Sequence, residues 1–166
     1  FMTKADWKGV CENFLTADGV FWPVPVNLDV SGEDAAGINN GDEIALFDPE
    51  GDEIMATMTV TEKWEQSDAE KKWECEKVYM GEGTPTAEEF WKIAEEDHPG
   101  VQMVMQQKPV NLAGPVKVLS EGDYPTRYAG VYHRPAESRK IFEDRGWSEV
   151  AALQLRNPMH RSHEYL

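Results

Sequence analysis

The sequence predicts an α+β chain in two parts: a small β-barrel or sandwich over residues 1–126, and the first strand, turn and helix of an α/β domain over residues 127–166. Short alternating apolar runs lie close together in the first part, as in small all-β units. In the second part the pattern changes to helix, apolar strand, turn and helix, which is how an α/β domain begins. Because 40% of the residues are hydrophobic and 10% are aromatic, the chain has enough apolar surface for a core.

The first part opens with a helix over residues 4–14, where apolar side chains recur at helical spacing. These side chains are Trp7, Val10, Cys11 and Phe14. Residues 21–30 are rich in strand-forming types. Pro23 and Pro25 restrict them to an edge or bulged strand, because proline cannot donate to a sheet ladder.

Two alternating runs, residues 43–47 and 53–64, flank a proline- and glycine-containing turn at residues 48–52. Strand, turn and strand in this order predict a β-hairpin. The hairpin is expected to supply part of the small β-unit.

Two helices are expected next. Residues 68–79 form a charged helix with a small apolar face, and residues 86–97 form a second helix capped by Thr86 or Thr84. Residues 101–119 are then expected to return to strand, broken at two points that contain proline. The last strands complete the predicted barrel or sandwich.

The second part begins with a helix over residues 135–146, with Pro135 in its first turn and Gly146 as its stop. Residues 149–153 are almost continuously apolar, as in a buried parallel strand. The Asn-Pro pair at 157–158 then predicts a turn and the start of another helix.

Charge excludes several classes of partner. The net charge of −15, from 31 acidic and 16 basic residues, opposes binding to nucleic acid and to anionic membranes. No apolar run reaches the ~18–20 residues that a membrane span needs. The two cysteines, Cys11 and Cys75, have no CxxC spacing and are expected to be free thiols in a reducing compartment, the cytoplasm. Residues 151–166 hold two basic residues and one acidic residue, whereas residues 1–150 hold 14 basic and 30 acidic residues.

Within that stretch several groups suited to binding an anion are expected to converge. Gln154 and Arg156 are two apart at a strand end and therefore point to the same side. Asn157 occupies a helix N-cap position, and His160 and His163 share one helical face. An amide, a guanidinium and two imidazoles at a strand end beside a helix start predict a site for a phosphate-like anion.

Simpler interpretations stay open for each part of this site. An HxxH pair on a helix is common, and zinc would need a third protein ligand that nothing at suitable spacing supplies. Arg156 could form a surface salt bridge instead. The combination of these groups is more specific than any one of them.

The run of residues 154–164 resembles the QxRN and HxxH motifs of the ATP sulfurylase family. The resemblance extends upstream to most of the chain, including the segments Phe21-Trp22-Pro23-Val24-Pro25-Val26, His98-Pro99-Gly100-Val101 and Arg134-Pro135-Ala136-Glu137. It implies a PUA-like β-barrel domain followed by a nucleotidyltransferase domain of Rossmann-like α/β build.

The resemblance also implies a reaction, in which a sulfate oxygen attacks the α-phosphorus of ATP to give adenylyl sulfate and pyrophosphate, or the reverse. The residues it implies for sulfate are Gln154 and Arg156, and the catalytic residues are Leu155, Arg156 and Asn157. The residues it implies for the nucleotide are Gln154, Leu155, Arg156, Asn157, His160 and His163. Leu155 stands where many members have threonine, so its role would be limited to backbone contacts or packing.

The family further implies that ATP acts as a substrate together with Mg²⁺, without a tightly bound cofactor or a protein-held metal. A cytoplasmic homo-oligomer is expected for the full-length protein, with no nucleic-acid or membrane partner. Both chain ends look cut and a second phosphate-binding segment is missing, so we expect no activity from the 166 residues alone. The alternatives are another HxxH-type nucleotidyltransferase and a non-enzymatic PUA-like binding module.

Overall fold

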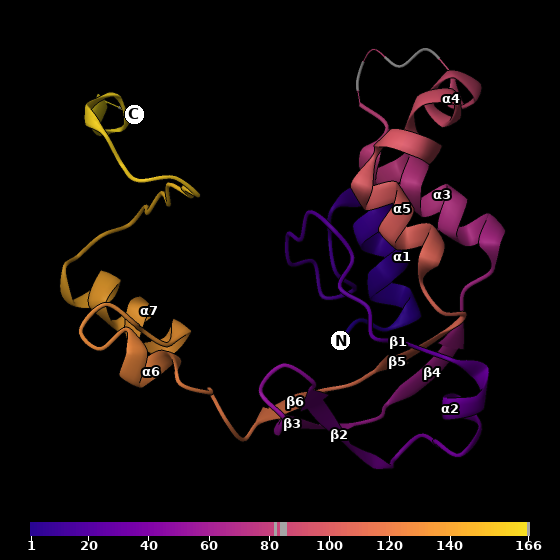
Figure 1. Ribbon diagram of the computed structural model, residues 1–166, viewed down its shortest axis with the longest axis horizontal. Helices are drawn as coiled ribbons and strands as arrows, with labels where there is room; N and C mark the ends of the chain where they lie inside the picture. Colours follow the sequence, from indigo (N-terminus) through magenta and orange to yellow (C-terminus); the bar gives the residue numbers. More distant parts are fainter. Residues whose placement is uncertain (82, 84–85, 166) are drawn as a thin grey trace. The chain divides into compact units, whose positions relative to one another are not determined.

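The computed structural model describes residues 1–81, 83 and 86–165, and it divides into two units, Phe1–Glu121 and Gly122–Leu166 (Figure 1). The elements of the first unit are α1 (Lys4–Asn13), β1 (Asp29–Val30), α2 (Gly32–Ala36), β2 (Glu43–Asp48), β3 (Glu53–Thr59), β4 (Glu62–Glu65), α3 (Asp68–Tyr79), α4 (Ala87–Asp97), α5 (Pro99–Gln106), β5 (Val110–Ala113) and β6 (Val116–Val118). Those of the second unit are α6 (Tyr124–Arg127), α7 (Pro135–Asp144) and the 3₁₀ helix η1 (Arg161–Tyr165).

Helix α1 confirms the first predicted element. The Thr3 side chain accepts from the Asp6 backbone N–H, and the Asp6 side chain accepts in return from the Thr3 backbone, which closes a capping box. Trp7 is buried on the inner face. Phe14, expected on the same apolar stripe, instead ends the helix in the left-handed conformation with φ 57° and is 46% exposed.

The predicted hairpin is confirmed as β2 and β3, which pair antiparallel from Glu43↔Thr59 to Asp48↔Glu53. A bulge between Leu46 and Phe47 interrupts the register. The second predicted run, residues 53–64, is not one strand, because it breaks after Thr59 and continues as β4 in another sheet.

Both sheets meet at a corner where two chain segments cross. The Thr61 N–H donates to the Ala113 carbonyl at 2.8 Å, and the Thr59 N–H donates to the Pro115 carbonyl at 3.3 Å. The backbone of Gly114 passes so close that a Cβ there would lie 1.9 Å from the Thr59 carbonyl oxygen. The unit therefore contains two three-stranded sheets, ordered β1-β5-β4 and β2-β3-β6, and they do not close into a barrel within the described residues.

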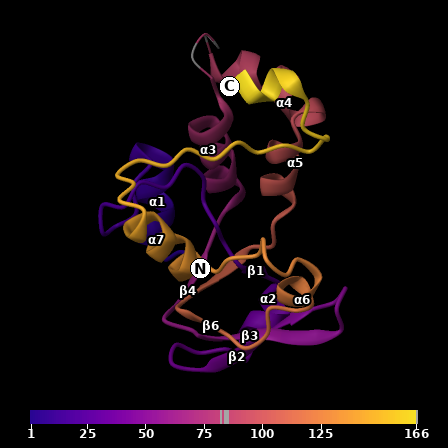
Figure 2. The ribbon, with the colours of Figure 1, turned by 90° about the vertical axis from the view of Figure 1, so that its left-hand side faces the viewer.

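Helices α1, α3, α4 and α5 gather at one end of the first unit and the sheets at the other, in both views (Figures 1 and 2). Helices α3 and α4 confirm the two helices predicted over residues 68–79 and 86–97, and Thr86 caps α4. Thr84, the alternative cap, lies outside the described residues. The buried cluster in this layer comprises Cys75, Phe90, Ala94, Val101 and Val104.

The strand expected to begin at residue 101 is wrong, because residues 99–106 form α5. The His98 ring accepts from the Val101 backbone N–H at Nδ1, 3.3 Å away, and Pro99 occupies the first turn. Val101 and Val104 lie three residues apart, so in a helix both side chains face the same way, and both are buried against the neighbouring helices. Strand resumes only at β5.

The expected strand over residues 21–30 is also largely wrong. Only an isolated bridge between Leu15 and Phe21 and the two-residue β1 are formed. Pro23 and Pro25 each lack an N–H, so a continuous ladder cannot run through them.

In the second unit, α7 confirms the helix predicted over residues 135–146, and Gly146 follows it with φ 68°. The Trp147 ring packs on Phe142 with centroids 6.1 Å apart. Residues 149–153, predicted as a buried strand, are exposed and form no strand. A strand needs a hydrogen-bonded neighbour, and none of the described residues pairs with this segment.

Candidate functional site

The predicted anion site lies in an irregular segment that ends in η1. Gln154, Leu155, Arg156, Asn157 and His160 are exposed, and His163 is half-buried. The α-helix expected to start at the Asn-Pro pair is wrong. The His163 N–H bonds to the His160 carbonyl three residues back at 2.9 Å, which is the tighter 3₁₀ pattern of η1.

The two histidines of the HxxH motif contact each other. Their ring centroids are 4.0 Å apart and the planes are inclined at 45°. The His160 backbone N–H donates to Nδ1 of His163 at 3.2 Å, and Oγ of Ser162 lies 2.7 Å from Nδ1 of His160. The motif spacing had suggested a shared helical face for the histidines, but it had not indicated the contact with Ser162.

Arg156 and Gln154 are less constrained than the histidines. Two basic groups elsewhere in the unit are paired: Arg134 bonds Glu137 at 3.1 Å and Lys140 bonds Asp144 at 3.0 Å. Within residues 86–165, as described, the structure records neither an ion pair nor a hydrogen bond for the Arg156 side chain, and no contact from it or from Gln154 to the histidine pair. The guanidinium is thus open to an anionic ligand.

The net charge of this segment is slightly positive, whereas that of the chain as a whole is strongly negative, and this favours binding of an anion here. Of the 16 basic and 31 acidic residues, residues 151–166 hold the two arginines 156 and 161 but only one acid, Glu164. No cluster of three or more histidine, cysteine or acidic side chains with the placement of a metal site occurs among the described residues. None of the helices in the described part of the chain is both long and apolar enough to cross a membrane.

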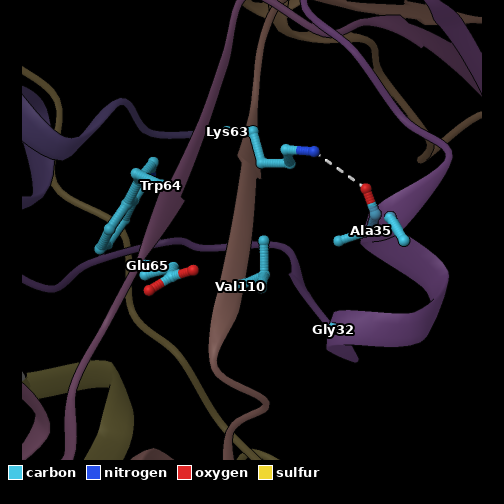
Figure 3. A pocket seen from close by; sticks show the side chains of 7 residues that line it. Gly32, Ala35, Lys63, Trp64, Glu65 and Val110 are labelled. Carbon is cyan, nitrogen blue, oxygen red and sulfur yellow. Dashed lines mark hydrogen bonds between the residues drawn. The ribbon is translucent and has the colours of Figure 1, made fainter.

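The first unit contains a hollow of about 210 Å³ beside α2, β4 and β5 (Figure 3). Its cation is already engaged: the Lys63 ammonium donates to the carbonyls of Ala35 at 3.0 Å and Ile38 at 2.8 Å, next to the last turn of α2. Lys63 therefore caps a helix end, and its ammonium is not free to bind an anionic ligand.

Two family models match the chain: PUA-like domain over residues 1–121, and ATP-sulfurylase over residues 129–166, which include the histidine pair. The first match covers most of the chain, so the chain belongs to the PUA-like domain family. The resemblance of its motifs to ATP sulfurylase is confirmed by the second match and by the curated relatives.

The sulfate adenylyltransferase of Desulfatibacillum aliphaticivorans is 76% identical over 166 residues, which are 100% of this chain and 39% of that protein. The sulfate adenylyltransferase of Desulfovibrio desulfuricans is 59% identical over 100% of this chain and 38% of its own length. The chain thus spans about two fifths of the length of these relatives. A solved structure titled hexameric APS kinase from Thiobacillus denitrificans is similar at 25% identity with a TM-score of 0.57, covering 99% of this chain and 25% of that one.

Proposed function

We propose that this chain serves a sulfate adenylyltransferase, contributing a PUA-like domain and part of the substrate site. The observation that carries the proposal is the ATP-sulfurylase match over residues 129–166, which contain the exposed Arg156 and the paired His160 and His163. The 76% identity of the whole chain to a protein named sulfate adenylyltransferase supports it.

In the proposed reaction a sulfate oxygen attacks the α-phosphorus of ATP, the new P–O bond forms, and the bond to pyrophosphate breaks. No protein nucleophile is required, so the protein acts by positioning and by electrostatic stabilisation. ATP is a substrate and brings Mg²⁺, which neutralises part of the phosphate charge. Positive charge on the protein side must then come from a locally basic segment, since the chain as a whole is strongly acidic.

Six residues of the segment have a role in this proposal. Gln154 and Arg156 bind sulfate, for which a guanidinium offers two parallel N–H donors. Asn157 and the histidine pair bind the nucleotide phosphates. Leu155 contributes only its backbone and packing, because its side chain has neither donor nor acceptor.

Three further features belong to the proposal. They are a domain division near residue 126, a Rossmann-like build of the α/β domain in the complete protein, and assembly of several copies in the cytoplasm. The likeness to a chain titled hexameric supports the assembly. The separation of the two described units after Glu121 is compatible with a division near residue 126.

A chimera tests the function directly. The 166-residue segment of the D. aliphaticivorans protein that matches this chain is replaced by this chain, and sulfate-dependent pyrophosphate release is measured. We expect activity from the chimera and none from the 166 residues alone. An inactive but folded chimera, beside an active parent, would refute the proposal.

Two arginines of the same segment provide a matched pair of variants. Arg156→Ala and Arg161→Ala each remove one exposed guanidinium and change the net charge equally. A charge-assisted hydrogen bond contributes about 1.5–3 kcal/mol, so Arg156→Ala should raise the KM for sulfate about 10- to 150-fold. Arg161→Ala should change it much less. Equal effects of the two substitutions, or equal loss of sulfate and ATP binding in Arg156→Ala, would contradict the assigned role.

A further inference from the structure

The HxxH spacing closes a reciprocal pair of hydrogen bonds at the start of η1. The His160 backbone N–H donates to the His163 ring, and the His163 backbone N–H donates to the His160 carbonyl, at 3.2 and 2.9 Å. A glutamate three residues after a helix cap plays the same part in a capping box. The second histidine therefore has a structural bond that holds its ring in place.

This bond determines which nitrogen of His163 carries the proton in the neutral ring. A backbone N–H can only donate, so Nδ1 of His163 must offer its lone pair. A neutral imidazole has one protonated nitrogen, which is then Nε2. His163 thus presents an N–H donor at the far side of its ring.

His160 has a comparable partner at the same ring position. The Ser162 hydroxyl oxygen lies 2.7 Å from Nδ1 of His160, so Nδ1 is engaged in both rings. No hydrogen bond to Nε2 of either ring is recorded among the described residues, and the rings lie side by side at 4.0 Å. The two Nε2 atoms are the ones available to a ligand.

We propose that Ser162 is a positioning residue, whose hydroxyl donates to Nδ1 of His160 and so holds His160 in the Nε2–H tautomer. The two neighbouring rings then offer a pair of N–H donors to one phosphate group. Ionised phosphate oxygens only accept hydrogen bonds, and a ring with a lone pair at Nε2 would repel them. The identity of the ligand rests on the proposed function, but the effect of Ser162 on the tautomer does not.

The tautomers can be measured in the chain itself, with ¹⁵N-labelled histidine and long-range ¹H–¹⁵N NMR at about pH 8.5, above the ordinary imidazole pKa of ~6.5. His98 serves as an internal reference, because its Nδ1 accepts from the Val101 backbone N–H. We expect the Nε2–H form for His98, His160 and His163. Ser162→Ala should turn only His160 into a mixture, and Ser162→Thr should preserve the original form.

A His160 ring protonated at Nδ1 in the unmodified chain would overturn the inference. An unchanged His160 spectrum in Ser162→Ala would overturn it as well. Because His98 and His163 keep their backbone donors, a general loss of folding in the variant would be seen as a change in these two histidines as well as in His160.

The chimera separates this inference from the proposed function. Ser162→Ala should lower kcat for pyrophosphate release about fivefold, the equivalent of one net hydrogen bond, with the KM for sulfate unchanged and with recovery in Ser162→Thr. Full activity of Ser162→Ala beside a defective Arg156→Ala would overturn the role of Ser162 alone. An inactive unmodified chimera would overturn the function, while the NMR result would still decide the tautomer.

Discussion

Glu74 of α3 provides a sharp test of how the first unit is held together. Its side chain is buried, and a single carboxylate oxygen, Oε2, accepts from Nε1 of Trp7 and from Nε2 of Gln66, each at 2.7 Å. Gln66 in turn accepts from Nδ2 of Asn111 at 3.3 Å. Burial raises the pKa of the Glu74 carboxyl above its ordinary value, although both hydrogen bonds act in the opposite direction. The carboxylate thus links α1, α3 and the sheet.

Two variants isolate the acceptor from the charge. Glu74→Gln and Glu74→Leu both remove the charge at similar volume, but only glutamine keeps an oxygen that can accept from Trp7 and Gln66. A buried donor left without a partner costs about 1–3 kcal/mol. With two such donors, the free energy of unfolding of Glu74→Leu should lie about 2–6 kcal/mol below that of Glu74→Gln.

Urea unfolding followed by tryptophan fluorescence measures this difference. The Trp7 ring lies 5.4 Å from that of Trp64 and 5.3 Å from that of Trp73, so the signal reports the region around Glu74. The slope with urea should be the same in both variants. Coincident unfolding midpoints would refute the reasoning, since they would mean that the two donors find water or other partners.

The same carboxyl predicts a dependence on pH. Its pKa in the folded state is raised above the ordinary 4.5, so the folded chain holds this proton more tightly than the unfolded chain. The contribution of Glu74 to stability is therefore present below pH 4.5 and is lost as the pH rises through the folded-state pKa. The unfolding free energy of the unmodified chain minus that of Glu74→Gln should therefore fall as the pH rises from 4.5 through the folded-state pKa of Glu74. A difference that does not change with pH would contradict a raised pKa for this carboxyl.

Two further predictions concern the core. Gly114→Ala should destabilise the first unit by about 3 kcal/mol or more in the same urea assay. The reason is that its Cβ would lie 1.9 Å from the Thr59 carbonyl oxygen, a backbone atom that cannot rotate away. Near-normal stability would contradict this expectation and show that the two segments can move apart at the corner. Burial raises the pKa of the Cys75 thiol to about 12, and that of Cys11 also rises, so both should react slowly with a disulfide reagent at about pH 8 and rapidly in urea. Rapid modification of the native chain would disprove the burial of these thiols.

Local patterns predicted several elements correctly. The 3.6-residue spacing of Trp7 and Val10 and the cap at Thr86 each identified a helix, and the alternation around residues 48–52 identified the hairpin. These signals come from neighbours in the sequence, which is why they can be read without the fold. The segment after residue 98 was wrongly predicted as a strand, because a run rich in valine and methionine suits a strand or a buried helix equally well. The cap at His98 and the packing of Val101 and Val104 against neighbouring helices favour a helix, α5, over a strand.

The candidate site was likewise predicted only in part. The residue types in positions 154–163 indicated an anion site, and the sequence motifs indicated which anions. The expected strand did not form, because a strand depends on partners that the described residues do not supply. A short 3₁₀ helix, η1, stands in place of the expected α-helix. The bond from Ser162 to His160 depends on the turn geometry of η1, which the sequence pattern alone did not reveal.

The sequence by itself thus determined the helices with clear periodicity, the β2–β3 hairpin, the uneven charge and the motif that identifies the candidate site. Only the tertiary structure decided that Glu74, on a helix that looks solvent-facing by its charge, is buried between Trp7 and Gln66. It also decided that one predicted strand splits between two sheets at a corner where Gly114 crosses Thr59. The physical reason is common to both: these contacts join residues 67, 8 and 55 positions apart, and no local pattern encodes which distant group will arrive.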